Sequence, residues 1–180
     1  MDEGVRRITG TRLIDHDGAI QHGDFLLHRD GSYSASKGDE DVIESIDGST
    51  RLVTRSLQNW HTHLAMILNR SMGEGLPLME WLETSVFPVE KGLTAEFVEV
   101  GTRAAVAEMI STGTTFACDM YYHPDVVARV LVESGVRGGS CGPITDFPTP
   151  SYPSGGGEAL QRMDALLRDC LLYTSPSPRD

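Results

Sequence analysis

From residue 52 onward, short β-prone segments alternate with amphipathic helical segments, and this alternation restricts the fold more than any other feature. The predicted strands span 52–59, 114–120 and 136–144, and the predicted helices span 76–93, 94–112, 124–135 and 158–168. Strands that alternate with helices form parallel βαβ units. The sequence therefore predicts an α/β protein, built as an open doubly wound sheet or as a (β/α)8 barrel.

Residues that favour helix ends support these boundaries. Thr94 is a preferred N-cap residue, and Pro124 suits the first turn of the helix that Gly135 ends. Pro88 lacks a backbone N–H, so the helix over 76–93 is expected to be interrupted there.

Residues 1–53 differ from the rest of the chain, because short apolar runs are separated by turn-forming pairs. These pairs are Asp17-Gly18, Asp30-Gly31 and Asp47-Gly48. A few short strands bury too little apolar surface for an independent core. We therefore expect a partial sheet that is completed by strands from elsewhere, followed by a second domain over 54–169.

Candidate functional side chains favour the barrel over the open sheet. No G-x-G-x-x-G or Walker pattern follows a predicted strand, which disfavours an open nucleotide-binding sheet. In barrels the carboxyl ends of the strands carry the chemistry, and His61, His63 and Asp119 all lie at such ends. A barrel needs about 250 residues, so the chain supplies only its first part.

The His-x-His formed by His61 and His63 is a candidate metal site. Side chains alternate along a strand, so both imidazoles point to one side and Thr62 points away. Imidazole is a good ligand for zinc, iron, nickel or copper. An isolated pair is more often two ordinary surface or core histidines, so the surrounding sequence has to decide.

Composition narrows the class of protein. The net charge of −11 argues against nucleic acid and anionic membranes as partners. No apolar run approaches the roughly 18 residues of a membrane span, and the first residues do not resemble a signal peptide. Few cysteines are present, which fits a reducing compartment. We expect a cytoplasmic protein.

The last residues of the chain, 170–180, read CLLYTSPSPRD. This string resembles the translation of a common sequencing adapter, so it is interpreted as an artefact and left out of the fold and the function. We therefore expect the chain to be a fragment whose natural sequence ends near residue 169.

Two longer stretches resemble a known family. They are HTHLAMILNRSMGEGLPLMEWLETSVFPVE and the later GTRAAVAEMISTGTTFACDMYYH. Together they resemble the N-terminal part of the amidohydrolase superfamily, in the branch of methylthioadenosine and S-adenosylhomocysteine deaminases and triazine amino- and chlorohydrolases. The resemblance implies that 54–169 is the first part of a metal-dependent hydrolase TIM barrel and that 1–53 supplies strands of a small β-sandwich.

The resemblance also implies roles for individual residues. His61 and His63 correspond to two ligands of one divalent ion, zinc or iron in this family. Glu90 corresponds to the carboxylate that binds ribose hydroxyls of nucleoside substrates. An ionised carboxylate accepts strong hydrogen bonds from two neighbouring hydroxyls. His123 follows Asp-Met-Tyr-Tyr as in the family and is interpreted as a structural or helix-capping residue, not a ligand. The family's other metal ligands and its acid and base groups fall beyond residue 169, so the chain contains no catalytic residue.

The implied reaction is hydrolytic deamination of a purine, pyrimidine or triazine ring by a metal-bound hydroxide. The parent enzyme would act on a small molecule and is expected to form homo-oligomers, as the family does. The chain of 180 residues by itself is expected to be inactive, because it supplies two metal ligands and none of the proton-transfer groups.

Three departures from the family keep alternatives open. Arg55-Ser56 replaces the usual Pro-Gly, and Trp60 replaces a Thr or Ser beside the metal pair. An Arg that helps hold the substrate of nucleoside deaminases is absent from 142–146, which disfavours methylthioadenosine or S-adenosylhomocysteine as the substrate. One alternative is a chlorohydrolase or cyclic-amide hydrolase, which would share His61 and His63. The other is a non-catalytic interaction module on the same fold.

Overall fold

The computed structural model describes residues 4–171. The tail from 172 onward, most of the adapter-like segment, lies outside the described residues, and the side chains from residue 169 onward are not described. Backbone contacts divide the chain into two compact units, Met1–Ser56 and Leu57–Asp180. Each unit is described by itself.

The first unit is a mixed five-stranded sheet. Its strands are β1 (Arg6–Ile14), β2 (Ile20–Leu27), β3 (Tyr33–Ala35), β4 (Glu44–Asp47) and β5 (Leu52–Val53). The order is β3-β2-β1-β4, and β5 also pairs with β1. Neighbours β1 and β2 are antiparallel, whereas β4 and β5 run parallel to β1. The small core includes Leu13 and Phe25.

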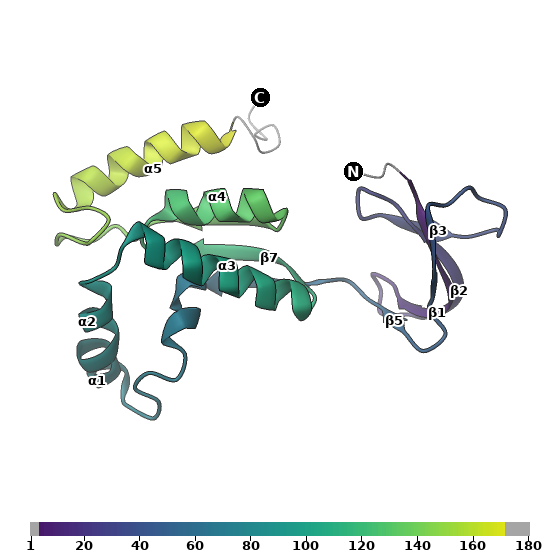
Figure 1. Cartoon of the computed structure of the whole chain (residues 1–180), viewed down its shortest axis with the longest axis horizontal. Helices are drawn as coiled ribbons and strands as arrows, with labels where there is room; N and C mark the ends of the chain where they lie inside the picture. Colours follow the sequence, from purple (N-terminus) through teal and green to yellow (C-terminus); the bar gives the residue numbers. More distant parts are fainter. Residues whose placement is uncertain (1–3, 172–180) are drawn as a thin grey trace. The chain divides into compact units, whose positions relative to one another are not determined.

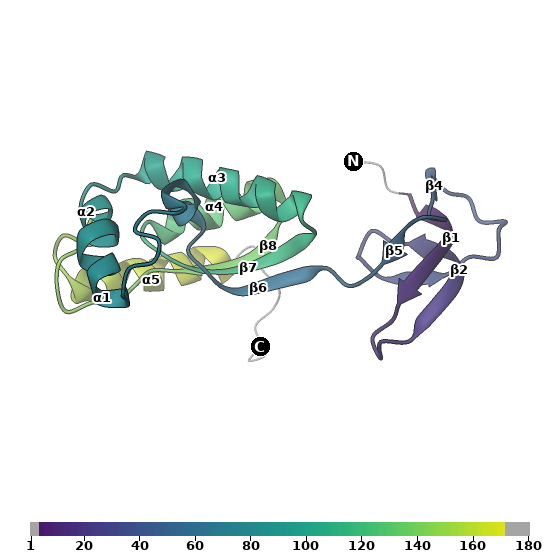
Figure 2. The ribbon, with the colours of Figure 1, turned by 90° about the horizontal axis from the view of Figure 1, so that it is seen from below.

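The second unit is built on a parallel sheet of three strands. They are β6 (Leu57–Thr62), β7 (Thr114–Met120) and β8 (Arg137–Cys141), in that order. The helices α3 (Ala95–Ser111) and α4 (Pro124–Ser134) cover one face of the sheet (Figures 1 and 2). Strands and helices alternate, which confirms the α/β class predicted from the sequence.

The core of the second unit lies between the sheet and these two helices. Thr94 caps α3 as predicted, because its hydroxyl accepts a hydrogen bond of 3.1 Å from the Phe97 N–H. Pro124 begins α4, and Gly135 ends it in a left-handed conformation. The helix faces bury small and branched side chains; the core residues are Leu64, Ala65, Leu93, Val98, Ala105, Val106, Met109, Ala117, Tyr121, Val126, Val127, Val130 and Leu131.

Two expectations about boundaries were wrong. The strand predicted over 52–59 is two strands, because β5 pairs with β1 in the first sheet and β6 pairs with β7 in the second. Pro88 does not interrupt the helix around it. The segments α1 (Leu78–Trp81), η2 (Leu82–Val86) and α2 (Phe87–Glu90) follow one another directly, and η2 is a π-helical turn.

The π-helical turn explains why Pro88 is tolerated. A π-turn widens the backbone ladder and restarts the α-helical register after it. Pro88 then occupies a first-turn position of α2, where its missing N–H and fixed backbone angle suit a helix start.

The remaining segments frame the second unit. A short 3-10 helix, η1 (Leu64–Asn69), follows the His pair and packs against α3. The last helix, α5 (Gly156–Leu171), follows the loop predicted over 147–157. Among the described helices, none is long and apolar enough to cross a membrane.

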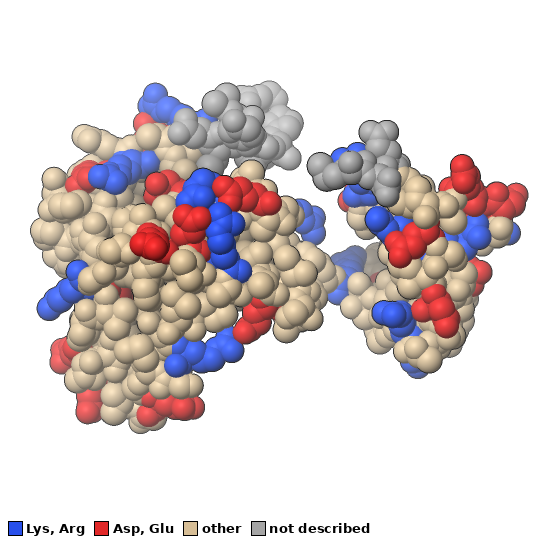
Figure 3. Space-filling model, viewed as in Figure 1, with Lys and Arg blue, Asp and Glu red and all other residues tan. Residues whose placement is uncertain are grey.

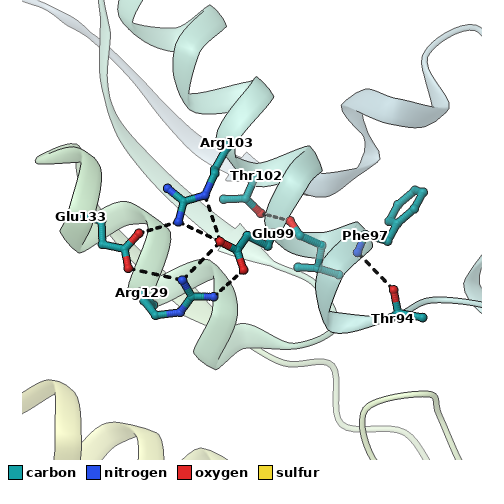
Figure 4. A network of polar contacts seen from close by, with 8 residues as sticks. Thr94, Phe97, Glu99, Thr102, Arg103, Arg129 and Glu133 are labelled. Carbon is teal, nitrogen blue, oxygen red and sulfur yellow. Dashed lines mark hydrogen bonds and ion pairs between the residues drawn. The ribbon is translucent and has the colours of Figure 1, made fainter.

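Four charged side chains join the exposed faces of α3 and α4 (Figure 4). Glu99 accepts from Arg103 at 2.8 Å and from Arg129 at 2.7 Å. Glu133 accepts from the same two arginines at 2.6 and 3.3 Å. Each carboxylate therefore lies between two guanidinium groups, and acidic and basic side chains lie side by side over these helices (Figure 3).

Candidate metal centre

The His pair follows an irregularity in β6. Asn59 pairs with Ala117 and Thr62 pairs with Asp119, so Trp60 and His61 lie opposite one residue of β7. The Asn59 side chain stabilises this bulge by accepting a hydrogen bond of 3.2 Å from the His61 N–H. Bulges redirect side chains and are frequent beside active sites.

The imidazole of His61, which lies in the bulge, is close to the imidazole of His63, which follows it. The ring centroids of His61 and His63 are 5.1 Å apart, and the rings are inclined by 79°. The Nδ1 atom of His63 is hydrogen-bonded to the backbone oxygen of Met120. Because a carbonyl oxygen only accepts, Nδ1 carries the proton and Nε2 is the nitrogen with a lone pair for an ion.

The arrangement fits a metal centre in part. Metal-bound histidines usually donate their second ring N–H to a carbonyl or carboxylate, as His63 does to Met120. Two imidazoles are suitable ligands for zinc, which takes three or four protein ligands. Among residues 4–171, the one place where three possible ligand atoms lie within 4.8 Å of one another is the exposed turn Asp15, His16 and Asp17. The His pair therefore supplies an incomplete ligand set.

A buried carboxylate lies directly behind the pair. Asp119 on β7 is inaccessible to solvent, and its Oδ1 accepts a hydrogen bond of 2.6 Å from the Leu64 N–H. Its Oδ2 is buried and has no partner among the described residues. Burial raises the pKa of Asp119 to about 6, and the Leu64 hydrogen bond opposes the rise.

Glu90 is placed near the pair by the end of α2. Its carboxylate is half-buried, and burial raises its pKa. The Tyr122 hydroxyl donates to Glu90 at 3.4 Å, while the Tyr121 hydroxyl interacts with it without a hydrogen bond of normal geometry. The Tyr121 ring lies 5.8 Å from the His63 ring, so Glu90, the two tyrosines and His63 form one cluster.

The tyrosines respond to the same surroundings. Burial, followed by the Glu90 charge, raises the pKa of Tyr122 to about 12, and both effects also raise the pKa of Tyr121. Both hydroxyls are therefore protonated donors at neutral pH. A carboxylate beside two hydroxyl donors and an imidazole can accept hydrogen bonds from a polar ligand.

Trp60 lies on the exposed side of the bulge. Its ring packs against Phe116 with centroids 4.5 Å apart and planes inclined by 40°, and its Nε1 donates to the Gln58 side chain at 3.1 Å. The side chain is 66 % exposed. His123, expected to be a structural or helix-capping residue, is the N-cap residue of α4, in a left-handed conformation with φ of 51° and without a capping hydrogen bond from its side chain. Its N–H donates to the Ser151 hydroxyl at 2.8 Å.

The sequence indicated His61, His63, Asp119 and Glu90 as candidates, but not the contacts that hold them. The hydrogen bond from the Leu64 N–H to Asp119 joins residues 55 positions apart, and no local pattern predicts it. The contact through the Met120 backbone oxygen leaves no signal in the sequence, because every residue has a carbonyl group.

The chain is similar in sequence to known proteins. A model of the amidohydrolase family matches residues 52–167. The chain is 40 % identical over 141 residues to a 5-methylthioadenosine/S-adenosylhomocysteine deaminase of Nitratidesulfovibrio vulgaris, covering 78 % of this chain and 32 % of that protein. It is 38 % identical to a 5'-deoxyadenosine deaminase of Methanothermobacter thermautotrophicus, covering 76 % and 32 %.

A solved structure shares the fold. An adenosine deaminase from Xanthomonas campestris, with bound zinc, superposes with a TM-score of 0.84 at 27 % identity, covering 94 % of this chain and 40 % of that one. The chain spans about a third of the length of the curated relatives it matches. By its sequence and its fold, the chain belongs to the amidohydrolase family.

Proposed function

We propose that the chain is the first part of a metal-dependent aminohydrolase in which His61 and His63 hold a divalent ion, zinc in the first place and iron as the alternative. The observation that carries this proposal is the His pair itself. Its rings are 5.1 Å apart, and the Met120 oxygen fixes the proton of His63 on Nδ1. The zinc in the similar adenosine deaminase supports the choice of metal.

The domain arrangement forms part of the same proposal. Residues 1–53 would belong to a β-sandwich, and 54–169 would begin a TIM barrel. Three parallel strands, helices on one face, and the His pair at a carboxyl end support it. The ligands and proton-transfer groups that complete the centre would come from the rest of the barrel.

The proposed reaction is hydrolytic deamination of an amino-bearing heteroaromatic ring. A divalent ion in such a centre lowers the pKa of water and so supplies a nucleophile at neutral pH. Nε2 of His63 and the ring of His61 would hold that ion. The relatives named as deaminases of adenosine-type compounds support a nucleoside as substrate.

Glu90 would bind the hydroxyl groups of the nucleoside sugar. Its carboxylate is half-buried in the cluster that contains His63, so a substrate held at the His pair would lie within reach of it. A carboxylate accepting hydrogen bonds from two neighbouring hydroxyls gains charge-assisted bonds that a neutral acceptor lacks.

The proposal is tested by metal analysis and product release with the full-length protein. We expect about one zinc per chain, and ammonia released from adenosine-type substrates. His61→Ala and His63→Ala should lose both, whereas His22→Ala, an exposed histidine on β2, should lose neither. A folded wild type that is free of metal would contradict the proposal. Chloride release from a chlorinated triazine without ammonia would assign a chlorohydrolase instead.

A further inference from the structure

Burying the carboxylate of Asp119 costs folding free energy. Its side chain is inaccessible to solvent, and one of its two carboxylate oxygens has no partner among the described residues. A buried carboxylate destabilises a fold unless its hydrogen bonds compensate. An apolar side chain would fill this position at a lower cost in folding free energy. The one hydrogen bond that Asp119 accepts therefore indicates its role.

That hydrogen bond fixes the backbone just after His63. The Leu64 N–H donates to Asp119 Oδ1 at 2.6 Å. His63 is the N-cap residue of η1, and its own side chain makes no capping bond. The first N–H groups of a helix have no partner within the helix and need an acceptor from outside. Asp119 supplies this acceptor from the neighbouring strand.

The next residue of β7 fixes the ring of His63. The Met120 backbone oxygen accepts from Nδ1, so consecutive residues of β7 hold the main chain after His63 and its imidazole. We propose that Asp119 is a positioning residue for the metal centre, which holds the Leu64 N–H so that His63 reaches the Met120 oxygen with Nε2 presented to the ion. This inference rests on the proposed function of the His pair.

Asp119 acts through His63 and is not placed as a ligand itself. Within residues 4–171, His61, His63 and Asp119 do not form a group of three whose ligand atoms lie within 4.8 Å of one another. The register points the same way, because Asp119 pairs with Thr62, the residue that separates the two histidines along β6. Residues that orient a metal-binding histidine change metal affinity by about 10- to 100-fold when they are replaced.

The test is made by NMR on this chain without added metal, with three variants. Asp119→Ala and Asp119→Leu remove the acceptor, and Leu replaces the buried charge by an apolar group, an exchange that folded proteins often tolerate. Asp119→Asn keeps an oxygen acceptor. Two signals are followed, namely the tautomer of the His63 ring and the hydrogen exchange of the Leu64 amide. The Phe97 amide, capped by Thr94 in α3, reports whether the unit is folded.

We expect Ala and Leu to speed exchange at Leu64 by about tenfold or more relative to Phe97, since the hydrogen bond is lost. Both variants should also shift His63 away from the Nδ1–H tautomer. In Asp119→Asn, the exchange rate of the Leu64 amide should stay within about threefold of the wild-type rate. If Ala does not fold, Leu gives the answer. The proposal would be overturned if a folded Asp119→Ala or Asp119→Leu variant kept the wild-type His63 tautomer and the wild-type Leu64 exchange rate. It would also be overturned if Asp119→Asn changed both signals as much as Asp119→Ala does.

The outcome is independent of metal binding. Loss of zinc in His63→Ala tests the proposed function, whereas the tautomer and the Leu64 exchange test the role of Asp119 alone. In the full-length protein the same variants provide a second readout. Asp119→Leu should weaken zinc affinity by about tenfold or more relative to wild type, whereas Asp119→Asn should keep most of the wild-type affinity.

Discussion

The proposed role of Glu90 in binding sugar hydroxyls predicts which substrates the centre prefers. In the full-length protein, Glu90→Gln should raise the KM for a nucleoside by about 10- to 100-fold, because a neutral amide replaces a charged acceptor of two hydroxyl groups. For the free base, which has no sugar, the change should be small. Steady-state ammonia release from the two substrates measures the difference. Glu83→Gln, an exposed position of the preceding π-turn, is the matched control.

His123 offers a pH-dependent prediction at the start of α4. Burial lowers its pKa below the ordinary value of 6.5, and Asp125 partly opposes this. The unfolded chain therefore binds a proton before the folded chain does, so stability is complete above pH 6.5 and falls as the pH drops through this value. Thermal unfolding between about pH 7 and pH 5 should show this decline, and His123→Asn should flatten it.

The backbone at His123 predicts a second difference. Asn tolerates the left-handed conformation at φ of 51°, whereas a β-branched residue does not. His123→Val should therefore lower the free energy of unfolding by about 1–2 kcal/mol at pH 8, while His123→Asn should change it little. Equal stability of the two variants would show that the conformation at this position is not strained.

For single residues, the sequence indicated which side chains are candidates for the site better than it indicated their burial and contacts. His61 and His63 were found because their spacing has a geometric meaning along a strand. The role of Asp119 was not, because burial of a carboxylate and its contact with Leu64 depend on how η1 packs after the strand. Side chains that act over long sequence separations need the fold before they can be paired.

Among the elements, α3 and η1 approach each other closely at Gly101. A Cβ atom added to Gly101 would lie 2.5 Å from the Ala65 backbone oxygen. Gly101→Ala should therefore push η1 away and destabilise the chain by about 1–2 kcal/mol, despite the better helix propensity of alanine. Gly157→Ala in the first turn of α5 meets no atom within 4 Å and should be neutral or stabilising. Denaturant unfolding compares the two.

The ion pairs between α3 and α4 make stability depend on pH. Arg129, followed by Arg103, lowers the pKa of Glu99 to about 2. The folded state holds this carboxylate ionised, so the contribution is present above the ordinary value of 4.5 and is lost as the pH falls towards 2. Glu99→Gln should make acid unfolding less steep over this range.

Salt provides the control for the network. The side chains are exposed, so their contribution should be small and should shrink in about 1 M salt, where screening is short-ranged. Wild type and Glu99→Gln should then unfold at nearly the same temperature. Glu96→Gln, in the first turn of the same helix but outside the network, should not change the salt dependence. A difference that persists in high salt would show that packing, not charge, joins the helices.

Element boundaries followed the sequence where local chemistry sets them. Thr94, Pro124 and Gly135 begin or end helices as predicted, because capping and left-handed conformations are local properties. Pro88 did not interrupt its helix, because the π-turn before it changes the register. The division of 52–59 into two strands depends on pairing with β1 and β7, which are distant in sequence.

For the whole molecule, the central fact is that the chain spans about a third of the curated relatives it matches. One face of the parallel sheet is covered by α3 and α4, while large apolar side chains of β6 and β7 remain exposed, among them Leu57, Trp60 and Met120. Parallel sheets are normally covered on both faces. The exposed side chains support the proposed barrel, which would cover them.

The same incompleteness predicts the activity of the chain. Its described residues bring two imidazoles together, whereas a catalytic zinc needs three protein ligands and an open position for water. The purified chain of 180 residues should therefore release no ammonia from adenosine or methylthioadenosine above the buffer rate, with zinc in the assay. The full-length protein, measured beside it, should be active. Ammonia release that accompanies the chain through purification and disappears in His63→Ala would show that two ligands suffice.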